Sequence, residues 1–371
     1  MHAKFNNMKK IDTPCLVIDL SGLEANIDLM QKLAAQMGVA VRPHCKTHKC
    51  SRIAKLQIAA GAIGISAAKL AEAEVLIEQG ISDILITSPI VAEPKLKRLA
   101  LCLKKAPELL LVVDNSQNAE ALNQLGAILH QPIQVLIDLD PGIGRTGVHP
   151  HDALNFAHFL QEQPWLRLQG IQCYAGNLQH VANYQERRER SLKTMEVASE
   201  IFRTLKSLFP ELHILTGSGT GTFDIDPEAS EVTEIQPGSY TVMDVQYESI
   251  GSKDTPEHFR RFQNAMTLFS SVISCNRAEH VTVDAGTKAI YFDPKYQPRI
   301  ISHPHLSYDW GGFGDEHGKI TGPGALPSNG DLIEMVVPHC DPTINLYDQF
   351  VMVRDNEIVD VWEIDLRGKS Q

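Results

Sequence analysis

Residues 39–50 read Val-Ala-Val-Arg-Pro-His-Cys-Lys-Thr-His-Lys-Cys, a short apolar run that ends in a cluster of basic side chains. The apolar run is typical of a buried strand, and a helical pattern follows it. The same order, an apolar run and then a helix-period segment, recurs up to about residue 240. We therefore interpret this stretch as the first of a series of strand–helix repeats.

The repeats predict the fold class. Eight apolar runs are expected to be strands, at 39–43, 62–66, 83–87, 109–113, 133–137, 168–174, 212–216 and 234–240. Segments with apolar residues at helical spacing lie between them, at 67–79, 93–105, 116–129, 150–161 and 184–209. Such alternation predicts parallel strands with right-handed crossovers, and eight repeats favour a closed (β/α)₈ barrel, with a doubly wound sheet as the alternative. Either fold places the chemistry at the carboxyl ends of the strands.

The alternation of predicted strands and helices ends after about residue 255. Strand-like runs without long helices follow, at 266–275, 280–284, 331–338, 349–354 and 357–364, and a loop rich in Gly and His spans 303–318. This pattern predicts a second, all-β domain. We expect a barrel over 21–255, a β domain over 256–371, and an N-terminal segment 1–20 that joins the β domain.

Composition limits the possible partners. The 371 residues carry a net charge of -11, so the basic surface that nucleic acids or anionic membranes require is not expected. No stretch approaches the roughly 20 apolar residues of a membrane span, and the polar residues 1–10 are not expected to act as an export signal. Seven cysteines without CxxC spacing favour a reducing cytoplasm over a disulfide framework. A small-molecule substrate is the expected partner.

Two lysines stand at the end of the first predicted strand. Lys46 and Lys49 are surrounded by Arg42, His44 and His48. Positive neighbours lower the pKa of a lysine and free its amine, which then forms Schiff bases with aldehydes. Spacing alone does not choose between the two lysines.

Glycine-rich turns follow the seventh and eighth predicted strands. Residues 216–222 read Thr-Gly-Ser-Gly-Thr-Gly-Thr, and residues 236–240 read Gln-Pro-Gly-Ser-Tyr. Backbone amides of such turns can approach a phosphate, and the hydroxyls of Ser218, Thr220 and Thr222 would add donors. The alternative is that the glycines only shape tight turns. A phosphate cradle that faces a nucleophilic lysine in a barrel fits pyridoxal 5'-phosphate (PLP).

Further candidates lie in other loops. His339 and Asp341 alternate in a segment expected to be extended, so both would face one divalent ion such as Mn²⁺, Mg²⁺ or Zn²⁺. The alternative is a strand-end histidine and an aspartate that starts a turn before proline. His180 follows the sixth strand as a candidate general base, and Arg145 follows the fifth and could reach a cofactor ring, unless both are structural.

These segments together resemble the D-threonine aldolase and D-serine dehydratase family, fold-type III PLP enzymes whose barrel is shared with alanine racemase. The resemblance runs nearly from end to end of the chain. Its motifs are Thr13-Pro-Cys-Leu-Val-Ile-Asp19, PHCKTHK at 43–49, GRTGV at 144–148, QCYAGNLQH at 172–180, GSGTGT at 217–222, QPGSY at 236–240 with Met243-Asp244, DEHG at 315–318 and PHCDPTIN at 338–345.

The resemblance assigns roles to these residues. It implies that Lys46 bears the cofactor, that His339 and Asp341 bind a divalent metal while Cys340 points away, and that the protein is a homodimer. Arg145 would contact the pyridine nitrogen. The remaining residues expected to bind the cofactor are Tyr174, Gly217, Ser218, Gly219, Thr220, Gly238, Ser239 and Tyr240.

The resemblance also favours one reaction. Asp341 and the Gln179-His180 pair resemble the aldolase branch, which implies retro-aldol cleavage of a D-β-hydroxy amino acid, such as D-threonine, to glycine and an aldehyde. His180 would take the hydroxyl proton. The alternative is a dehydratase of D-serine or D-3-hydroxyaspartate that releases ammonia and a 2-oxo acid. An amino-acid racemase and a non-catalytic PLP-binding protein are less favoured readings.

Overall fold

The computed structural model describes residues 10–310 and 314–371, and the chain divides into two compact units. The barrel unit comprises Leu29–Lys46, Ile53–Gly238 and Lys369–Gln371, and the β unit comprises Met1–Asp28, Thr47–Arg52 and Ser239–Gly368. The polar start before Lys10 and residues 311–313 of the long Gly- and His-rich loop lie outside the described residues. The chain leaves the barrel unit directly after Lys46 and again directly after Gly238.

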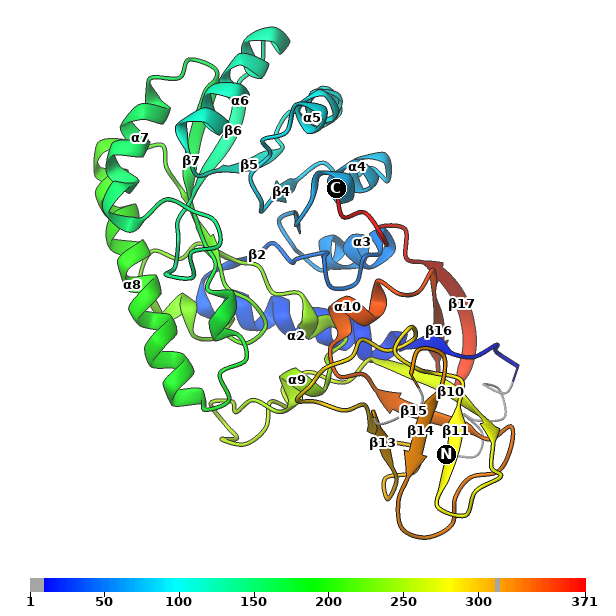
Figure 1. The fold of residues 1–371 in the computed structure, drawn as a ribbon. Helices are drawn as coiled ribbons and strands as arrows, with labels where there is room; N and C mark the ends of the chain where they lie inside the picture. Colours follow the sequence, from blue (N-terminus) through cyan, green and yellow to red (C-terminus); the bar gives the residue numbers. More distant parts are fainter. Residues whose placement is uncertain (1–9, 311–313) are drawn as a thin grey trace. The chain divides into compact units, whose positions relative to one another are not determined.

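Eight parallel strands form the wall of the barrel unit, in the order β2-β9-β8-β7-β6-β5-β4-β3 (Figure 1). They are β2 (Ala40–Val41), β3 (Ile65–Ala67), β4 (Ile84–Ile86), β5 (Leu110–Val113), β6 (Ile133–Asp138), β7 (Leu166–Cys173), β8 (Ile214–Gly217) and β9 (Glu234–Ile235). The two ends of this sheet are joined by a parallel bridge between His44 and Ser66, beside a hydrogen bond from Cys45 N–H to Ser66 O (2.9 Å). The sheet therefore closes, and the predicted (β/α)₈ barrel is confirmed.

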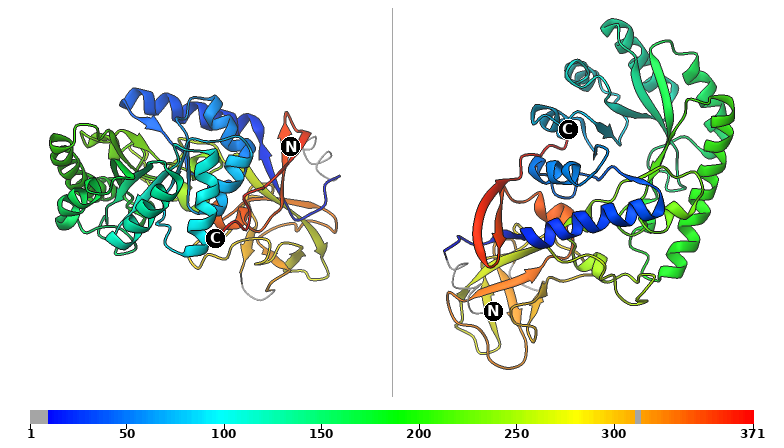
Figure 2. Two further views of the ribbon diagram at one scale, coloured as in Figure 1. Left: turned by 90° about the horizontal axis from the view of Figure 1, so that it is seen from above. Right: turned by 180° about the vertical axis from the view of Figure 1, so that it is seen from behind.

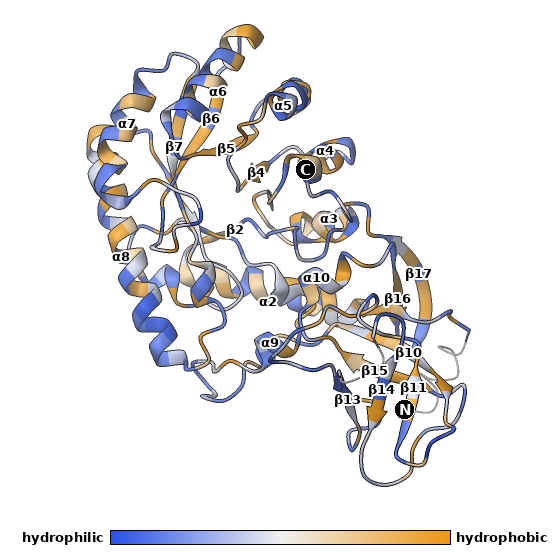
Figure 3. Cartoon of the chain, viewed as in Figure 1, coloured by the Kyte–Doolittle hydropathy of each residue, from blue (hydrophilic) through white to orange (hydrophobic). Residues whose placement is uncertain are grey.

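Helices cover the outer side of these strands, as Figures 1 and 2 show for α4 to α8. The helices of this region are α3 (Ser51–Ala59), α4 (Leu70–Glu78), α5 (Glu93–Lys105), α6 (Ser116–Leu129), α7 (Ala153–Gln161) and α8 (Tyr184–Leu208). Asparagine caps begin two of them: Asn115 accepts the N–H of Asn118 at 2.8 Å, and Asn183 accepts that of Glu186 at 2.9 Å. The apolar strands and the two-faced helices are visible in Figure 3, and an apolar cluster of Leu85, Leu110, Val112, Leu136 and Ile214 joins neighbouring strands.

Two backbone features shape the strands near the site. Gly170 (φ +156°) lets β7 approach β8, because a Cβ there would lie 1.8 Å from the carbonyl oxygen of Ile214. The run predicted as a strand over 234–240 is a strand only at Glu234–Ile235. Pro237 has no N–H to donate to a ladder, and the chain then turns into the 3₁₀ helix η4 (Ser239–Thr241).

The β unit is built on a nine-stranded sheet with the path β13-β14-β11-β10-β1-β16-β17, and β15 joins β10 to β12. The strands are β1 (Cys15–Asp19), β10 (Met266–Ser274), β11 (His280–Val283), β12 (Arg299–Ile300), β13 (Ser307–Asp309), β14 (Gly318–Thr321), β15 (Leu332–Val336), β16 (Gln349–Arg354) and β17 (Glu357–Glu363). Val17, Phe269, Leu332, Val351 and Val353 form its apolar core. The predicted β domain is confirmed as a mostly-strand unit, although it is not all-β, because helix α10 (Cys340–Ile344) lies within it.

Some elements of the structure were not among the predictions. Helix α2 (Leu20–Met37) and strands β12, β13 and β14 were not predicted, and the strands among them are two to four residues long. Two short helices, α9 (Val245–Glu248) and α10 (Cys340–Ile344), lie in the β unit. Among the described residues, no helix is both long and apolar enough to cross a lipid bilayer.

Candidate active site

Lys46 lies at the carboxyl end of the barrel strands, just beyond β2. The backbone that leads to it is held in the wall, because Arg42 N–H donates to Ile235 O of the neighbouring strand at 2.9 Å. Closer to the lysine, its own N–H donates to His44 Nδ1 at 3.3 Å, and His44 Nε2 lies 3.2 Å from Thr87 Oγ1. These contacts fix the position of the lysine backbone and of the His44 ring.

The charges around the two candidate lysines differ from the prediction. Arg42 forms a buried ion pair with Glu234, with Nε 3.0 Å from Oε1 and Nη2 3.3 Å from Oε2. Because this carboxylate compensates the guanidinium, Arg42 is not the uncompensated positive neighbour expected from the sequence. Lys49 belongs to the β unit, where its backbone is left-handed (φ +51°) and its carbonyl accepts the N–H of Leu366 at 2.9 Å.

Three of the predicted cofactor residues meet at one aromatic ring. Lys46 Nζ lies 6.0 Å from the centroid of the Tyr174 ring, and the Arg145 guanidinium carbon lies 5.6 Å from the same centroid. Both cations are within the range in which a ring face attracts positive charge. Arg145 is exposed, in a loop whose turn is shaped by Asp140, which accepts the amides of residues 142–144. The Tyr174 ring thus lies within about 6 Å of both the Lys46 amine and the Arg145 guanidinium.

A buried polar network joins the strand ends beside this ring. Asp138 accepts hydrogen bonds from Gln172 Nε2 (2.9 Å) and from Thr146 Oγ1 (2.7 Å), and Gln236 Nε2 donates to Thr216 Oγ1 (2.9 Å). Burial raises the pKa of Asp138, although the two hydrogen bonds oppose that shift. A sequence signal for this network was available, because Asp138, Gln172, Thr216 and Gln236 each lie at or just beyond the carboxyl end of an apolar strand, whereas Thr146 lies in the loop after β6.

The glycine-rich loop 217–222 leaves β8 at the same end of the barrel. Its hydroxyl groups differ from the prediction, because Ser218 Oγ and Thr222 Oγ1 donate to the buried carboxylate of Asp226, at 2.6 and 2.8 Å. Ser191 Oγ donates to the other carboxylate oxygen. Burial raises the pKa of Asp226, and these three donors lower it in part. The two hydroxyls are therefore engaged by Asp226. Three N–H groups of the loop are also bonded within the protein: Gly219 N–H donates to Thr222 Oγ1 (3.3 Å), Gly221 N–H to Gln179 Oε1 (3.0 Å) and Thr222 N–H to Gly219 O (3.1 Å).

The other predicted residues of the barrel unit lie in loops that follow neighbouring strands. His180 is partly buried in the loop between β7 and α8, next to Gln179, whose side chain contacts the glycine-rich loop. Gly238 is the last residue of this unit before the chain passes into the β unit. Since β2, β9 and β8 are consecutive in the sheet, the segments that carry Lys46, Gly238 and Gly217–Thr222 begin from three adjacent strand ends.

Two predicted cofactor residues belong to the β unit. Ser239 Oγ donates to Asp341 Oδ1 at 3.1 Å, so this hydroxyl lies beside a predicted metal ligand. Tyr240 is fully buried, and its ring packs 5.5 Å from that of Phe262. Its aromatic ring is therefore part of the core of this unit.

His339 is held by a carboxylate that the sequence analysis did not assign. Asp244 Oδ2 accepts hydrogen bonds from the His339 ring at Nδ1 and from Cys340 N–H, both at 2.9 Å, and Asp244 Oδ1 caps α9 by accepting Tyr247 N–H at 2.9 Å. A carboxylate on Nδ1 fixes the ring orientation and leaves Nε2 as the ligating nitrogen, which is the usual arrangement of metal-binding histidines. Met243-Asp244 entered the sequence analysis as part of the family resemblance, without a role for the carboxylate. An aspartate is a common helix cap, so the sequence offered a reason to place Asp244 at the start of α9 but none to place it beside His339.

The segment around His339 is not extended as predicted. Helix α10 begins at Cys340, with His339 as its N-cap, because Pro342 is tolerated in a first turn and Asp244 accepts the Cys340 amide. Cys340 also does not point away. Its Sγ lies within 4.8 Å of the ligand atoms of Asp244 and His339, and 3.4 Å from Asp341 Oδ1. Burial raises the pKa of the Cys340 thiol well above its ordinary value, and the two nearby carboxylates add to that shift.

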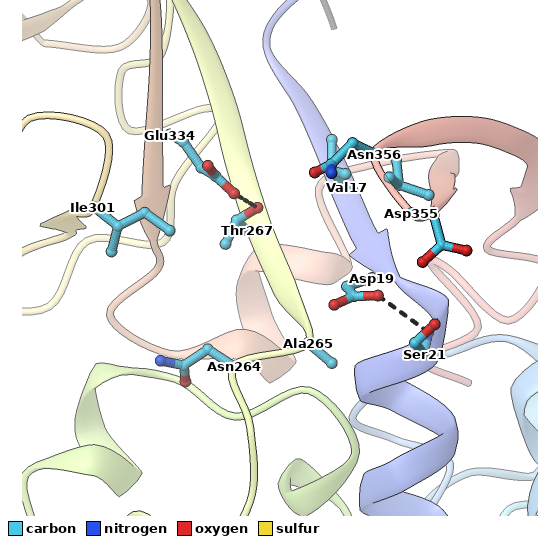
Figure 4. A pocket seen from close by; sticks show the side chains of 11 residues that line it. Val17, Asp19, Ser21, Asn264, Ala265, Thr267, Ile301, Glu334, Asp355 and Asn356 are labelled. Atoms are coloured by element: carbon cyan, nitrogen blue, oxygen red, sulfur yellow. Dashed lines mark hydrogen bonds between the residues drawn. The ribbon is translucent and has the colours of Figure 1, made fainter. Parts of the chain in front are cut away.

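A separate pocket of about 320 Å³ lies in the β unit (Figure 4). Asp19, Glu334 and Asp355 line it, and Figure 4 shows the hydrogen bond from Thr267 Oγ1 to Glu334 Oε1 (2.9 Å). None of the predicted site residues lies in its lining.

The chain is similar in sequence to known families and proteins over most of its length. The family model of the alanine racemase N-terminal domain matches residues 18–246, and the model of a serine dehydratase domain matches residues 265–353. A D-threonine aldolase from Arthrobacter sp is 36% identical over 368 residues, which cover 98% of this chain and 95% of the relative. A 3-hydroxy-D-aspartate aldolase from Paracoccus denitrificans is 31% identical and covers 97% and 93%, respectively.

The fold is also similar to solved structures. The crystal structure of D-threonine aldolase from Filomicrobium marinum superposes with a TM-score of 0.92 at 32% identity, and the match covers 98% of this chain and 97% of that chain. The similarity therefore includes both units and is not limited to the barrel.

Proposed function

Because the chain belongs to the D-threonine aldolase and D-serine dehydratase family, we propose that it is a lyase that cleaves a D-configured β-hydroxy amino acid to glycine and an aldehyde. D-Threonine is the proposed model substrate. Similarity to two aldolases over more than nine tenths of their length supports cleavage of a carbon–carbon bond over dehydration.

The observation that carries this proposal is the order of three strands. Strands β2, β9 and β8 are consecutive in the barrel wall, and they lead to Lys46, to Gly238 and to the loop Gly217–Thr222. A primary amine and two glycine-containing turns at adjacent strand ends are the parts that PLP needs for its aldehyde and its phosphate. The residues present thus fit the cofactor.

The proposed cofactor contacts follow from this arrangement. Lys46 Nζ would hold the aldehyde carbon covalently, and Tyr174 and Arg145 would face the pyridine ring. Gly217, Ser218, Gly219 and Thr220, together with Gly238 and Ser239, would hold the phosphate mainly through their turns of main chain, since the Ser218 hydroxyl is engaged with Asp226 and the Gly219 N–H with Thr222 Oγ1. Tyr240 would support that turn from the core. Bound PLP supplies the acceptor for the electron pair that is left on Cα when the Cα–Cβ bond breaks.

The chain's own residues would manage the proton and the hydroxyl group. His180 is proposed to take the proton of the substrate hydroxyl, because its loop lies directly against the glycine-rich loop. Loss of that proton is what allows the C–O bond to become a carbonyl as the Cα–Cβ bond breaks.

We further propose that His339 and Asp341 bind a divalent cation, Mn²⁺, Mg²⁺ or Zn²⁺. The orientation of His339 by Asp244 supports a metal-binding role, since this carboxylate leaves Nε2 as the ligating atom. Asp341 would supply a hard oxygen ligand. Such a ligand favours Mn²⁺ or Mg²⁺, whereas a thiolate ligand favours Zn²⁺. Such a cation supplies the Lewis acid that polarises a hydroxyl oxygen.

Two further expectations concern the oligomeric state and the cellular location of the protein. We expect a homodimer, which light scattering on the purified protein would test. We also expect a cytoplasmic location, which is supported by the free thiols of Cys15, Cys102, Cys173, Cys275 and Cys340.

The product of D-threonine tests the proposal. The purified protein, supplied with PLP and Mn²⁺, is incubated with D-threonine, with 3-hydroxy-D-aspartate and, as a stereochemical control, with L-threonine. Glycine and acetaldehyde in equal amounts from D-threonine, with no turnover of L-threonine, are expected. Formation of 2-oxobutanoate and ammonia without glycine would identify a dehydratase and contradict the aldolase.

A further inference from the structure

Two loops of the barrel unit are interlocked through the side chain of Gln179. This side chain is 2% exposed, its Oε1 accepts the N–H of Gly221 at 3.0 Å, and its Nε2 donates to Thr222 Oγ1 at 3.1 Å. The backbones fit just as closely: a Cβ at Gly219 would lie 2.5 Å from Gln179 Oε1, and one at Gly221 would lie 2.1 Å from Gln179 O. The glycine-rich loop therefore cannot shift without moving the residue that precedes His180.

Arg187 makes a second connection between the same two loops. It is fully buried on α8, its Nε–H donates to Gly221 O at 2.8 Å, and its Nη1–H donates to Val181 O. Its guanidinium also lies 5.4 Å from the ring centroid of Tyr184. One rigid, planar group thus holds the glycine-rich loop and the residue that follows His180.

One helical turn further on, α8 contacts the glycine-rich loop again. Ser191 Oγ donates to Asp226, and the same carboxylate accepts the hydroxyls of Ser218 and Thr222. Arg187 and Ser191 are four residues apart and so lie on one face of the helix. The loop that carries His180 and the loop that would hold the phosphate therefore share a common buried support.

We infer that Gln179 and Arg187 are positioning residues that couple occupancy of the glycine-rich loop by a phosphate group to the placement of His180. The inference rests on the proposed function, because it requires the loop 217–222 to hold the cofactor phosphate. Both side chains act through main-chain groups, Gly221 on one side and residues 179 and 181 on the other. A phosphate that fixes the loop 217–222 also fixes Gly221 and, through Gln179 and Arg187, the two residues that flank His180.

Hydrogen–deuterium exchange of the cofactor-free protein, with inorganic phosphate as the probe, tests this coupling. In the wild-type protein, phosphate is expected to slow amide exchange both in 217–222 and in 175–183. In Gln179→Leu and Arg187→Met, the effect on 175–183 is expected to be lost, and phosphate affinity is expected to fall roughly tenfold for each lost connection. Arg188→Met is the matched control, because Arg188 lies on the exposed side of the same helix, paired with Glu228, and should leave both effects intact.

The kinetic signature separates positioning from general damage. With saturating PLP and D-threonine, Gln179→Leu is expected to lower kcat about tenfold with little change in KM, since His180 is displaced while the substrate contacts remain. If Arg187→Met does not fold, as judged by circular dichroism, Gln179→Leu carries the test by itself.

The outcomes separate this inference from the proposed function. Slowed exchange in 217–222 with unchanged exchange in 175–183 of the wild-type protein would overturn the coupling and leave the phosphate site in place. Persistence of both effects in both variants would overturn the role of these two side chains. No effect of phosphate on 217–222 would overturn the phosphate site itself, and the inference with it.

Discussion

Replacement of Asp244 by asparagine tests whether the β unit binds a metal through His339. The carboxylate accepts the His339 ring and the Cys340 amide on Oδ2, and it caps α9 through Oδ1. Asparagine caps a helix about as well as aspartate, so the short helix should survive the change. An amide nitrogen in place of Oδ2 cannot accept either hydrogen bond, so the imidazole loses the group that fixes its orientation.

The expected loss of metal affinity follows from the typical effect of removing a carboxylate that supports a ligating histidine. Loss of a carboxylate that orients a ligating histidine typically lowers metal affinity by 10–100-fold, which corresponds to about 1.4–2.7 kcal/mol. We expect the upper part of this range, because both hydrogen bonds of Oδ2 are short and Asp244 is fully buried. Affinity is the correct quantity to compare, since activity would also report any change elsewhere in the site.

Metal titration of the chelator-stripped protein measures the effect. Mn²⁺ and Zn²⁺ are titrated in competition with a fluorescent chelator for the wild type, Asp244→Asn, His339→Ala and Glu248→Gln. The last is the matched control, because Glu248 lies on the same short helix and pairs with Arg299. Asp244→Asn should bind 10–100-fold more weakly, and His339→Ala should lose the site. Equal affinities for wild type and His339→Ala would refute the reasoning.

Three more changes test other parts of the structure. Lys46→Ala should abolish the visible absorbance of bound PLP, whereas Lys49→Ala should retain it; spectra after reconstitution decide between them. Glu234→Gln should lower the free energy of unfolding by about 3–5 kcal/mol in urea denaturation, because it leaves the Arg42 charge buried, whereas a paired Arg42→Met and Glu234→Leu change should restore most of the loss. Burial raises the pKa of Asp226 above its ordinary 3.8, so the folded state binds more protons than the unfolded one above that pH, and stability falls as pH rises through the raised pKa. The melting temperature of the wild type should therefore drop relative to Asp226→Asn from about pH 4 upward, and a pH-independent difference would contradict the assignment.

The barrel was predictable from sequence because its signal is local. From β2 to β7, each wall strand is followed by an α-helix, and α5 (Glu93–Lys105) and α6 (Ser116–Leu129) begin and end at the predicted residues. The eighth predicted strand, 234–240, was overestimated in length: only Glu234–Ile235 forms a strand, because Pro237 has no N–H for the ladder.

The polar contacts of the candidate site were less predictable, because they depend on groups distant in sequence. Ser218 and Thr222 were expected to face a ligand, but Asp226 engages both hydroxyls, and nothing in the motif indicates a buried carboxylate there. Likewise, the support of His339 comes from Asp244, 95 residues earlier. Strand β1 also depends on residues that are distant in sequence, because its five residues pair with β10 and β16, more than 200 positions later in the chain.

The closure of the barrel wall also sets an order of assembly. The Arg42–Glu234 pair joins residues 192 positions apart, whereas the parallel strands β3 and β4 are connected by a single crossover through α4. The entropy of loop closure grows with chain length, and parallel pairings over long separations form slowly. A chain still emerging from the ribosome can form β3 to β7 before residue 234 exists, but it cannot close the wall that carries Lys46. The pairing of β2, which precedes Lys46 in the wall, with β9 is therefore the last pairing to close the barrel.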